Sequence, residues 1–146
     1  MGAEMDTRQW LPVGGLLGTV VAAGYMVVQL NAQTPSTPTG DFTNATVAQV
    51  RDAQGQVVLE GQFEAAVEDD GDLERRATLS PTGVDADATG EAEVEFTTTV
   101  PTKQELEFSV KNLEPGARFT FVIDGKTIAT ATANRRGRAE VELDVK

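Results

Sequence analysis

The chain has 146 residues, a formal net charge of −11 at pH 7, and neither histidine nor cysteine. This length fits one domain of modest size, and the acidic charge argues against nucleic acid as a partner because phosphates are repelled. Without these two residue types the chain lacks disulfides, thiolate metal sites, and the commonest general base and metal ligand. The composition therefore predicts a protein that is not an enzyme and holds no cofactor.

The first predicted element is one transmembrane helix over residues 10–31. The run from Trp10 to Leu30 contains no charged residue. At 1.5 Å per residue its length matches a hydrocarbon core about 30 Å thick. The alternative is a cleaved signal peptide followed by a secreted domain, but a signal peptide usually has a shorter apolar run.

The charges that flank the helix predict its orientation. Arg8 precedes the apolar run, whereas the first charge after it is Asp41. By the positive-inside rule, residues 1–9 are cytoplasmic and the C-terminal part is periplasmic or extracellular. We therefore expect a single-pass protein of the bacterial inner (cytoplasmic) membrane, in contact with the lipid bilayer.

A stripe of small residues follows one side of this helix. Gly14, Gly18 and Ala22 recur every four residues, which would let another helix approach closely. The simpler interpretation is that Gly and Ala are frequent in membrane helices. The stripe predicts helix packing against integral membrane protein subunits.

Residues 32–45 are rich in Thr, Pro and Ser and show no apolar periodicity, so we expect an extended linker. Residues 46–146 then form the extracytoplasmic domain. Its apolar residues recur at every second position, which indicates strands with one buried face. The expected inward-facing residues are Val57, Leu59, Phe63, Ala65 and Val67; Ala92, Val94 and Phe96; Leu106, Phe108 and Val110; Phe119, Phe121 and Ile123; and Ala139, Val141, Leu143 and Val145.

Turn signals such as Asp124-Gly125 separate these runs. The spacing predicts an all-β fold, an antiparallel sandwich of about 7–8 strands, with a small barrel as the alternative. The segment from Asn112 to Val145 has a Leu-x-Pro-Gly motif, an Asp-Gly turn and a Gly turn between alternating strands. In this it resembles the closing strands of bacterial extracytoplasmic immunoglobulin-like or fibronectin-type modules. The resemblance implies a fold and no functional residue.

Two groups of charged residues are candidate sites. Asp85, Asp87 and Glu91 resemble the opening of a calcium loop, although the twelfth position of such a loop, counted from Asp85, is Phe96 and not a carboxylate. Solvated acidic loops are the simpler interpretation. The second group, Arg135, Arg136 and Arg138, lies on one predicted turn and is a possible contact with a partner or lipid headgroups. Arginines that only keep the turn soluble are the simpler interpretation.

From these observations we expect a non-enzymatic accessory or structural subunit of a bacterial membrane protein complex. A photosynthetic reaction centre with its light-harvesting ring and a respiratory complex are examples by analogy. Its β domain would stabilise neighbouring subunits on the periplasmic face. The alternatives are a membrane-anchored module that binds a ligand or protein, and a cleaved secreted domain.

Overall fold

A computed structural model describes residues 18–22, 25–29, 37–99 and 102–146, the first two ranges by their backbone alone. The described chain is all-β, with antiparallel strands in a nearly closed sheet. The strands of this sheet are β3 (Val47–Arg51), β4 (Val57–Gln62), β5 (Val67–Asp69), β6 (Asp72–Pro81), β7 (Thr89–Phe96), β8 (Gln104–Lys111), β9 (Arg118–Ile123), β10 (Lys126–Thr132) and β11 (Ala139–Val145).

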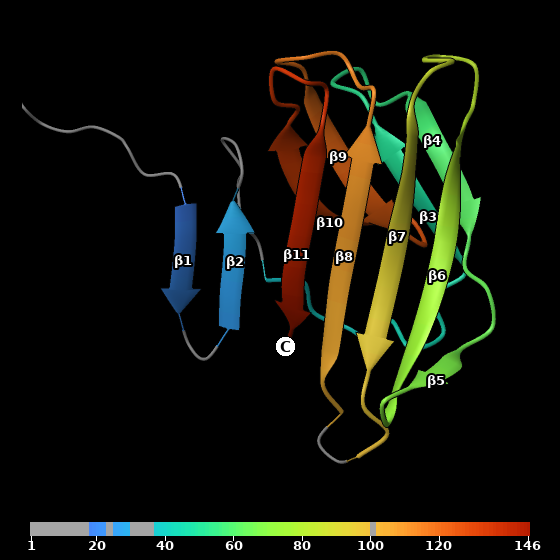
Figure 1. The fold of residues 1–146 in the computed structure, drawn as a ribbon, viewed down its shortest axis with the longest axis vertical. Helices are drawn as coiled ribbons and strands as arrows, with labels where there is room; N and C mark the ends of the chain where they lie inside the picture. The colour runs from blue at the N-terminus through green and yellow to red at the C-terminus, as the bar shows by residue number, and fades with distance from the viewer. Residues whose placement is uncertain (1–17, 23–24, 30–36, 100–101) are drawn as a thin grey trace, which may run out of the picture.

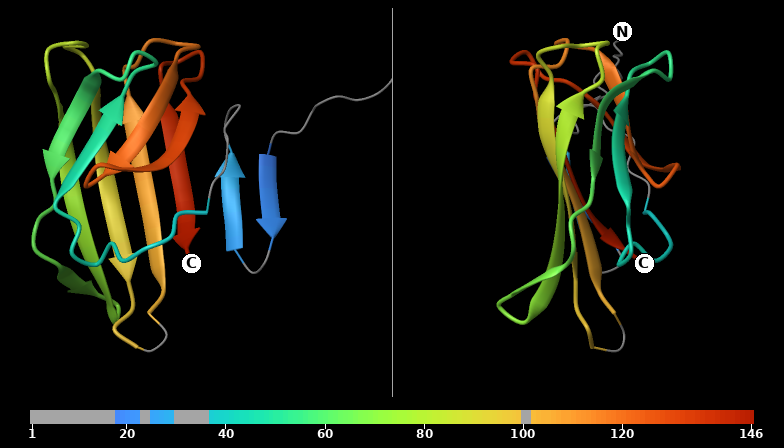
Figure 2. Two further views of the ribbon diagram at one scale, coloured as in Figure 1. Left: turned by 180° about the vertical axis from the view of Figure 1, so that it is seen from behind. Right: turned by 90° about the vertical axis from the view of Figure 1, so that its right-hand side faces the viewer.

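The strand order is β10-β9-β3-β4-β6-β7-β8-β11, with β5 paired to β6. The sheet folds into two facing layers, β10-β9-β3-β4 and β6-β7-β8-β11, as Figures 1 and 2 show. Only a short pairing of Leu59 with Pro81 and of Glu60 with Ser80 joins the layers through β4 and β6. In immunoglobulin constant domains the third strand lies in a layer with the sixth and seventh strands. Here, with the short β5 set aside, the third strand of the domain is β6, and it lies in one layer with the fourth and fifth strands, β7 and β8. The strand order of this domain therefore differs from that of immunoglobulin constant domains.

The core lies between the two layers. Phe108 of β8 and Phe121 of β9 are fully buried there, edge to face, with ring centroids 5.1 Å apart. Residues alternate between buried and exposed along β8 and through most of β7 and β11. The inward faces predicted for residues 92–96, 106–110 and 119–123 are confirmed.

The prediction for residues 57–67 is wrong in part. A register shift between Val50 and Arg51 displaces the pairing of β3 with β4, so Val58 is buried while Val57 is half-buried. Val58 is the extra residue of this bulge, and beyond it Leu59 and Phe63 are buried as predicted. The strand then ends at Gln62, and Ala65 and Val67 are exposed, Val67 by 65%.

Gly61 lies where the two layers join. A Cβ atom at this position would stand 2.2 Å from the carbonyl oxygen of Thr78 in β6. A real Cβ atom does not approach a backbone oxygen this closely. β4 can therefore lie this close to β6 only because residue 61 is a glycine.

Part of the predicted linker packs on the domain. Residues 37–46, which we term the strap, cross its width before β3 begins (Figure 2). Within the strap Phe42 is 4% exposed and Ala45 2% exposed, and both belong to the core. The packed domain therefore includes residues before Thr46, where the sequence pattern placed its start.

Two further strands, β1 (Gly18–Ala22) and β2 (Tyr25–Gln29), pair with each other as a separate two-stranded sheet beside β11 (Figure 1). Here the structure has strands within the segment predicted as a helix. β-Branched valines favour strands, whereas a bilayer favours a helix that satisfies its own backbone groups. The described residues include no helix with the length and hydrophobicity that a membrane crossing requires. Residues 10–17, 23–24 and 30–31 lie outside the described residues, and the membrane span stays a prediction.

Candidate functional site

The outer face of the β6-β7-β8-β11 layer carries an unusual density of carboxylates. The alternation that buries one side of each strand turns the glutamates between the core residues outward. We term this surface, which faces the viewer in Figure 1, the acidic face. Its members are Glu74 of β6; Glu91, Glu93 and Glu95 of β7; Glu105 and Glu107 of β8; and Glu140, Glu142 and Asp144 of β11.

The strand register places like charges directly opposite one another. In one row Glu93 faces Glu107, and Glu107 faces Glu142. In the next row Glu95 faces Glu105, which in turn faces Asp144. Directly opposed residues have Cβ atoms about 5 Å apart, and like charges at that distance destabilise a sheet. The layer therefore keeps an arrangement that opposes its own stability.

Arg76 partly neutralises one edge of the acidic face. Its guanidinium contacts the carboxylate of Glu74 and lies 3.3 Å from that of Glu93. Hydrogen bonding to Glu74 and the charge of Glu93 raise the pKa of Arg76 above its ordinary value. This guanidinium lies at the β6 edge of the acidic face, so the carboxylates on β8 and β11 are farther from it than those on β7.

Glu105 is the carboxyl most affected by this arrangement. Partial burial, followed by the charges of Glu142, Asp144, Glu95 and other carboxylates, raises the pKa of Glu105 to about 7. Its protonation therefore changes near neutral pH.

Two neighbouring carboxyls are affected in the same direction. Partial burial raises the pKa of Glu93 and of Glu107, and repulsion by Glu74 and by Glu142, respectively, adds to the effect. A group that brought positive charge to these rows would remove the repulsion.

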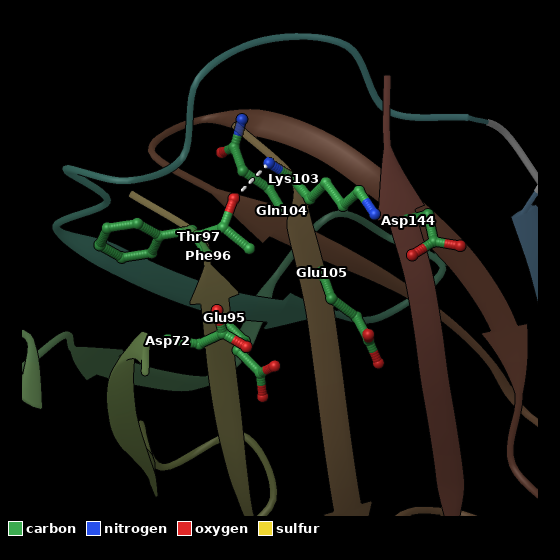
Figure 3. A pocket seen from close by; sticks show the side chains of 8 residues that line it. All are labelled: Asp72, Glu95, Phe96, Thr97, Lys103, Gln104, Glu105 and Asp144. Atoms are coloured by element: carbon green, nitrogen blue, oxygen red, sulfur yellow. Dashed lines mark hydrogen bonds between the residues drawn. The ribbon is translucent and has the colours of Figure 1, made fainter. Parts of the chain in front are cut away.

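A shallow hollow of about 270 Å³ lies at one end of the acidic face. Figure 3 shows Glu95, Glu105 and Asp144 projecting into it from three adjacent strands, with the Lys103 side chain extended towards Asp144. The remaining lining residues are Asp72, Phe96, Thr97 and Gln104. The hollow is thus lined by four carboxylates and one lysine, an excess of negative charge that suits cationic groups.

One group of three carboxylates in the described residues has ligand atoms within 4.8 Å of one another, namely Glu74, Glu93 and Glu95. Arg76 already contacts two of them. A guanidinium in this position supplies the positive charge that a metal ion would otherwise bring. The arrangement therefore fits recognition of arginine at least as well as it fits a metal.

The predicted calcium residues do not converge in this way within the described chain. Asp85 and Asp87 lie on the loop between β6 and β7, where an oxygen of Asp85 accepts the backbone N–H of Asp87 at 3.3 Å. Glu91 lies on β7, in the acidic face. Calcium binding by these three residues stays a prediction.

The three arginines lie on the turn between β10 and β11, and all are exposed. The side-chain oxygen of Asn134 accepts the backbone N–H groups of Arg136 at 2.8 Å and Arg138 at 3.1 Å. This bonding orders the backbone of the turn, so Arg135 and its neighbours are presented from a fixed loop. Their contact with a partner stays a prediction.

The predicted helix-packing residues are not brought to a site. Gly14 lies outside the described residues, and Gly18 and Ala22 are the end residues of β1. Helix packing by this stripe stays a prediction.

The acidic face was not among the candidate sites predicted from the sequence. A signal was present, since Glu91, Glu93 and Glu95 alternate, as do Glu140, Glu142 and Asp144. Which carboxylates oppose one another depends on strand order and register, and the sequence pattern left both open.

No known family model matches the sequence, and no curated protein or solved structure is significantly similar to the chain.

Proposed function

We propose that the chain is a non-enzymatic accessory subunit of a bacterial membrane protein complex. Its N-terminal apolar segment anchors it in the inner membrane, and its β domain, a two-layer sandwich, stabilises neighbouring subunits on the periplasmic face. The observation that carries the proposal is the strap, because its packing holds the domain close to the predicted anchor.

Side chains from distant strands hold the strap in place. Arg75 of β6 donates from Nη1 to the carbonyl oxygens of Ala45 at 2.9 Å and Thr43 at 3.3 Å. Gln104 of β8 accepts the N–H of Phe42 at 2.6 Å and donates to the carbonyl of Gly40 at 3.2 Å. These charged and amide groups bind strap backbone that would otherwise hydrogen-bond to water.

The turn between β9 and β10 holds the end of the strap. An Asp124 oxygen accepts the Thr46 hydroxyl at 2.6 Å and the Val47 N–H at 2.8 Å. Partial burial works to raise the pKa of Asp124, but these hydrogen bonds outweigh it, and the pKa lies below its ordinary value. Lys126 contacts the Thr39 carbonyl and lies 5.3 Å from the centre of the Phe42 ring, a cation–π distance.

The packed strap limits how far the domain can move from a membrane anchor. A predicted span ending at Asn31 is separated from Thr37 by residues 32–36 alone, and a chain of this length reaches at most about 20 Å. A domain held so closely is suited to contacts with fixed neighbours, whereas a module that captures soluble ligands gains from a long, flexible tether. The strap therefore favours the accessory subunit over the tethered ligand-binding module.

The residue types in the sequence support a non-enzymatic role. The chain lacks histidine and cysteine, and carboxylates, lysines and hydroxyls would have to supply any catalysis. The acidic hollow is the observation that favours the second candidate, a membrane-anchored module that binds a cationic ligand or protein. A cleaved secreted domain remains the third candidate.

Mild detergent extraction of native membranes, followed by size-exclusion chromatography and mass spectrometry, tests the accessory role. The full chain should migrate with a constant set of membrane proteins. Gly18→Leu adds bulk to the predicted helix-packing stripe and should release the chain. Val20→Leu is the matched control, since it adds bulk on the opposite side of a helix, and it should leave the association intact. Migration of the wild-type chain alone would contradict the proposal.

A further inference from the structure

We propose that the acidic face is a docking surface for an extended, arginine- and lysine-rich segment of a neighbouring protein. The inference rests on the proposed accessory function and deepens it by assigning the surface and the chemistry of the partner.

The first argument is the charge on the face. The rows through Glu107 and Glu105 stack carboxylates across β7, β8 and β11. Among the described residues, Arg76 pairs with Glu93 at the β6 edge, and Lys103 extends towards Asp144 at the end of the other row. A solvated face needs charge, but it does not need like charges directly opposite one another, because mixed signs keep a sheet soluble without repulsion. A basic partner would remove this repulsion as it binds.

The second argument is the spacing of the rows. Carboxylates of one row, such as Glu93 and Glu107, are one strand apart, about 5 Å. Successive rows, such as those of Glu93 and Glu95, are two residues apart along a strand, about 7 Å. An extended segment has the same repeat of about 7 Å between every second side chain. A basic residue at every second position would therefore place one cation over each row.

The third argument is that Arg76 already shows the mode of binding. Its guanidinium contacts carboxylates of two strands, Glu74 and Glu93, at the edge of the face. Guanidinium groups bind carboxylates in a fork geometry that a lysine ammonium does not offer. A partner arginine could repeat this arrangement over the pairs formed by Glu107 with Glu142 and by Glu105 with Asp144.

The charge also excludes other occupants. Anionic lipid headgroups and nucleic acid would be repelled by the acidic face. An apolar partner would find no apolar patch there, since the outward positions of the central rows are carboxylates. A divalent cation and a second copy of this chain, with its Arg135 turn, are the occupants that the test must separate.

The test uses the full chain in lipid nanodiscs and a fluorescent synthetic peptide of five Arg-Thr repeats. Fluorescence anisotropy measures its dissociation constant at pH 8 in low and in physiological salt. The first variant combines Glu93→Gln, Glu107→Gln and Glu142→Gln, which neutralises the central row. The matched control combines Glu60→Gln, Asp87→Asn and Glu114→Gln, three exposed acids away from the acidic face.

We expect the central-row variant to bind the peptide at least about tenfold more weakly than the wild type, since each exposed ion pair contributes a few-fold. The control should change the dissociation constant by less than about twofold. Thermal unfolding should show that the central-row variant remains folded, because its substitutions remove repulsion. Equal weakening in both variants would mean attraction to net charge alone and would overturn the proposal, as would absence of peptide binding.

Two further outcomes would replace the proposed occupant. Calcium binding that depends on the central row, with no peptide binding, would assign the face to a cation. Self-association abolished by serine at Arg135, Arg136 and Arg138 would assign it to a second copy. If the peptide fails to bind but the chain still co-purifies with membrane proteins, this inference falls and the accessory function stands. If the wild-type chain has no companions, the accessory function itself falls.

Discussion

Glu105→Gln should stabilise the folded domain at alkaline pH. The folded-state pKa of Glu105 is about 7, against an ordinary value of 4.5. Because the folded state holds the proton more tightly, the stability from the protonated form is complete below about pH 4.5 and is lost as pH rises through 7. The wild-type chain should therefore lose stability between pH 5 and pH 8.

The size of the effect follows from the shift in pKa. A shift of this size corresponds to about 3 kcal/mol if fully expressed. Because Glu105 is only half-buried, solvent screening reduces this to about 1 kcal/mol. Glutamine keeps the shape of a protonated glutamate without its charge, so Glu105→Gln should raise the melting temperature at pH 8 by about 4 °C and change it little at pH 5.

Differential scanning calorimetry of the full chain across pH 5 to 8 measures this difference. Asp41 and Asp124 have pKa values below their ordinary ones, through hydrogen bonds with Thr43 and with Thr46, so they remain ionised in this range. Glu60→Gln, in the other layer, is the control and should shift the melting temperature by no more than about 1 °C. An unchanged or lower melting temperature for Glu105→Gln at pH 8 would refute the electrostatic reasoning.

Three other substitutions test the fold and the strap. Arg75→Met removes the donors to the strap carbonyls and should lower the free energy of unfolding by about 2 kcal/mol in urea titrations. Hydrogen exchange in residues 42–46 should become faster, and unchanged exchange would contradict the role of Arg75 in holding the strap. Phe42→Ala should reduce the free energy of unfolding by about 3 kcal/mol, whereas a loss below about 1 kcal/mol would mean that the strap is not part of the core. Gly61→Ala should destabilise the domain by more than about 3 kcal/mol because its Cβ meets the carbonyl of Thr78, and a stable variant, measured by the same titration, would show that the two layers do not approach there.

Strands with regular alternation could be predicted from the sequence because alternation reports which face is buried whatever the pairing partner. Ala92, Val94 and Phe96 of β7 and Leu106, Phe108 and Val110 of β8 illustrate this. The segment after Val57 could be predicted only in part, since Leu59 and Phe63 are buried as expected but Ala65 and Val67 are exposed. The register shift opposite Arg51 and the departure of the chain after Gln62 depend on neighbouring strands.

The strap was missed for a different physical reason. Its residues have no periodic pattern, and Phe42 is the one large apolar side chain among threonines and prolines. Its position depends on hydrogen bonds with Arg75 and Gln104, which lie 30 or more residues along the chain. Arg75 also interrupts the alternation of Leu73, Ala77 and Leu79 in β6. The reason for a charged residue at this position is its hydrogen bond to the strap, which the sequence does not reveal.

The acidic face could be predicted only in part. The alternating glutamates of β7 and β11 are visible in the sequence, but the strand between them is β8, which lies far from β11 in the chain. The opposition of Glu107 to both Glu93 and Glu142 therefore depends on a strand order that the sequence left open.

Zero-length carbodiimide cross-linking in native membranes, followed by mass spectrometry, tests the account most directly because it joins carboxylates to lysine amines that touch them. The account predicts cross-links from Glu93, Glu107 and Glu142 to lysines of one or a few membrane subunits, and their loss when these three residues are replaced by glutamine. Cross-links distributed evenly over all exposed acids of the chain, or none to other membrane proteins, would contradict the claim that this domain docks on its neighbours through the acidic face.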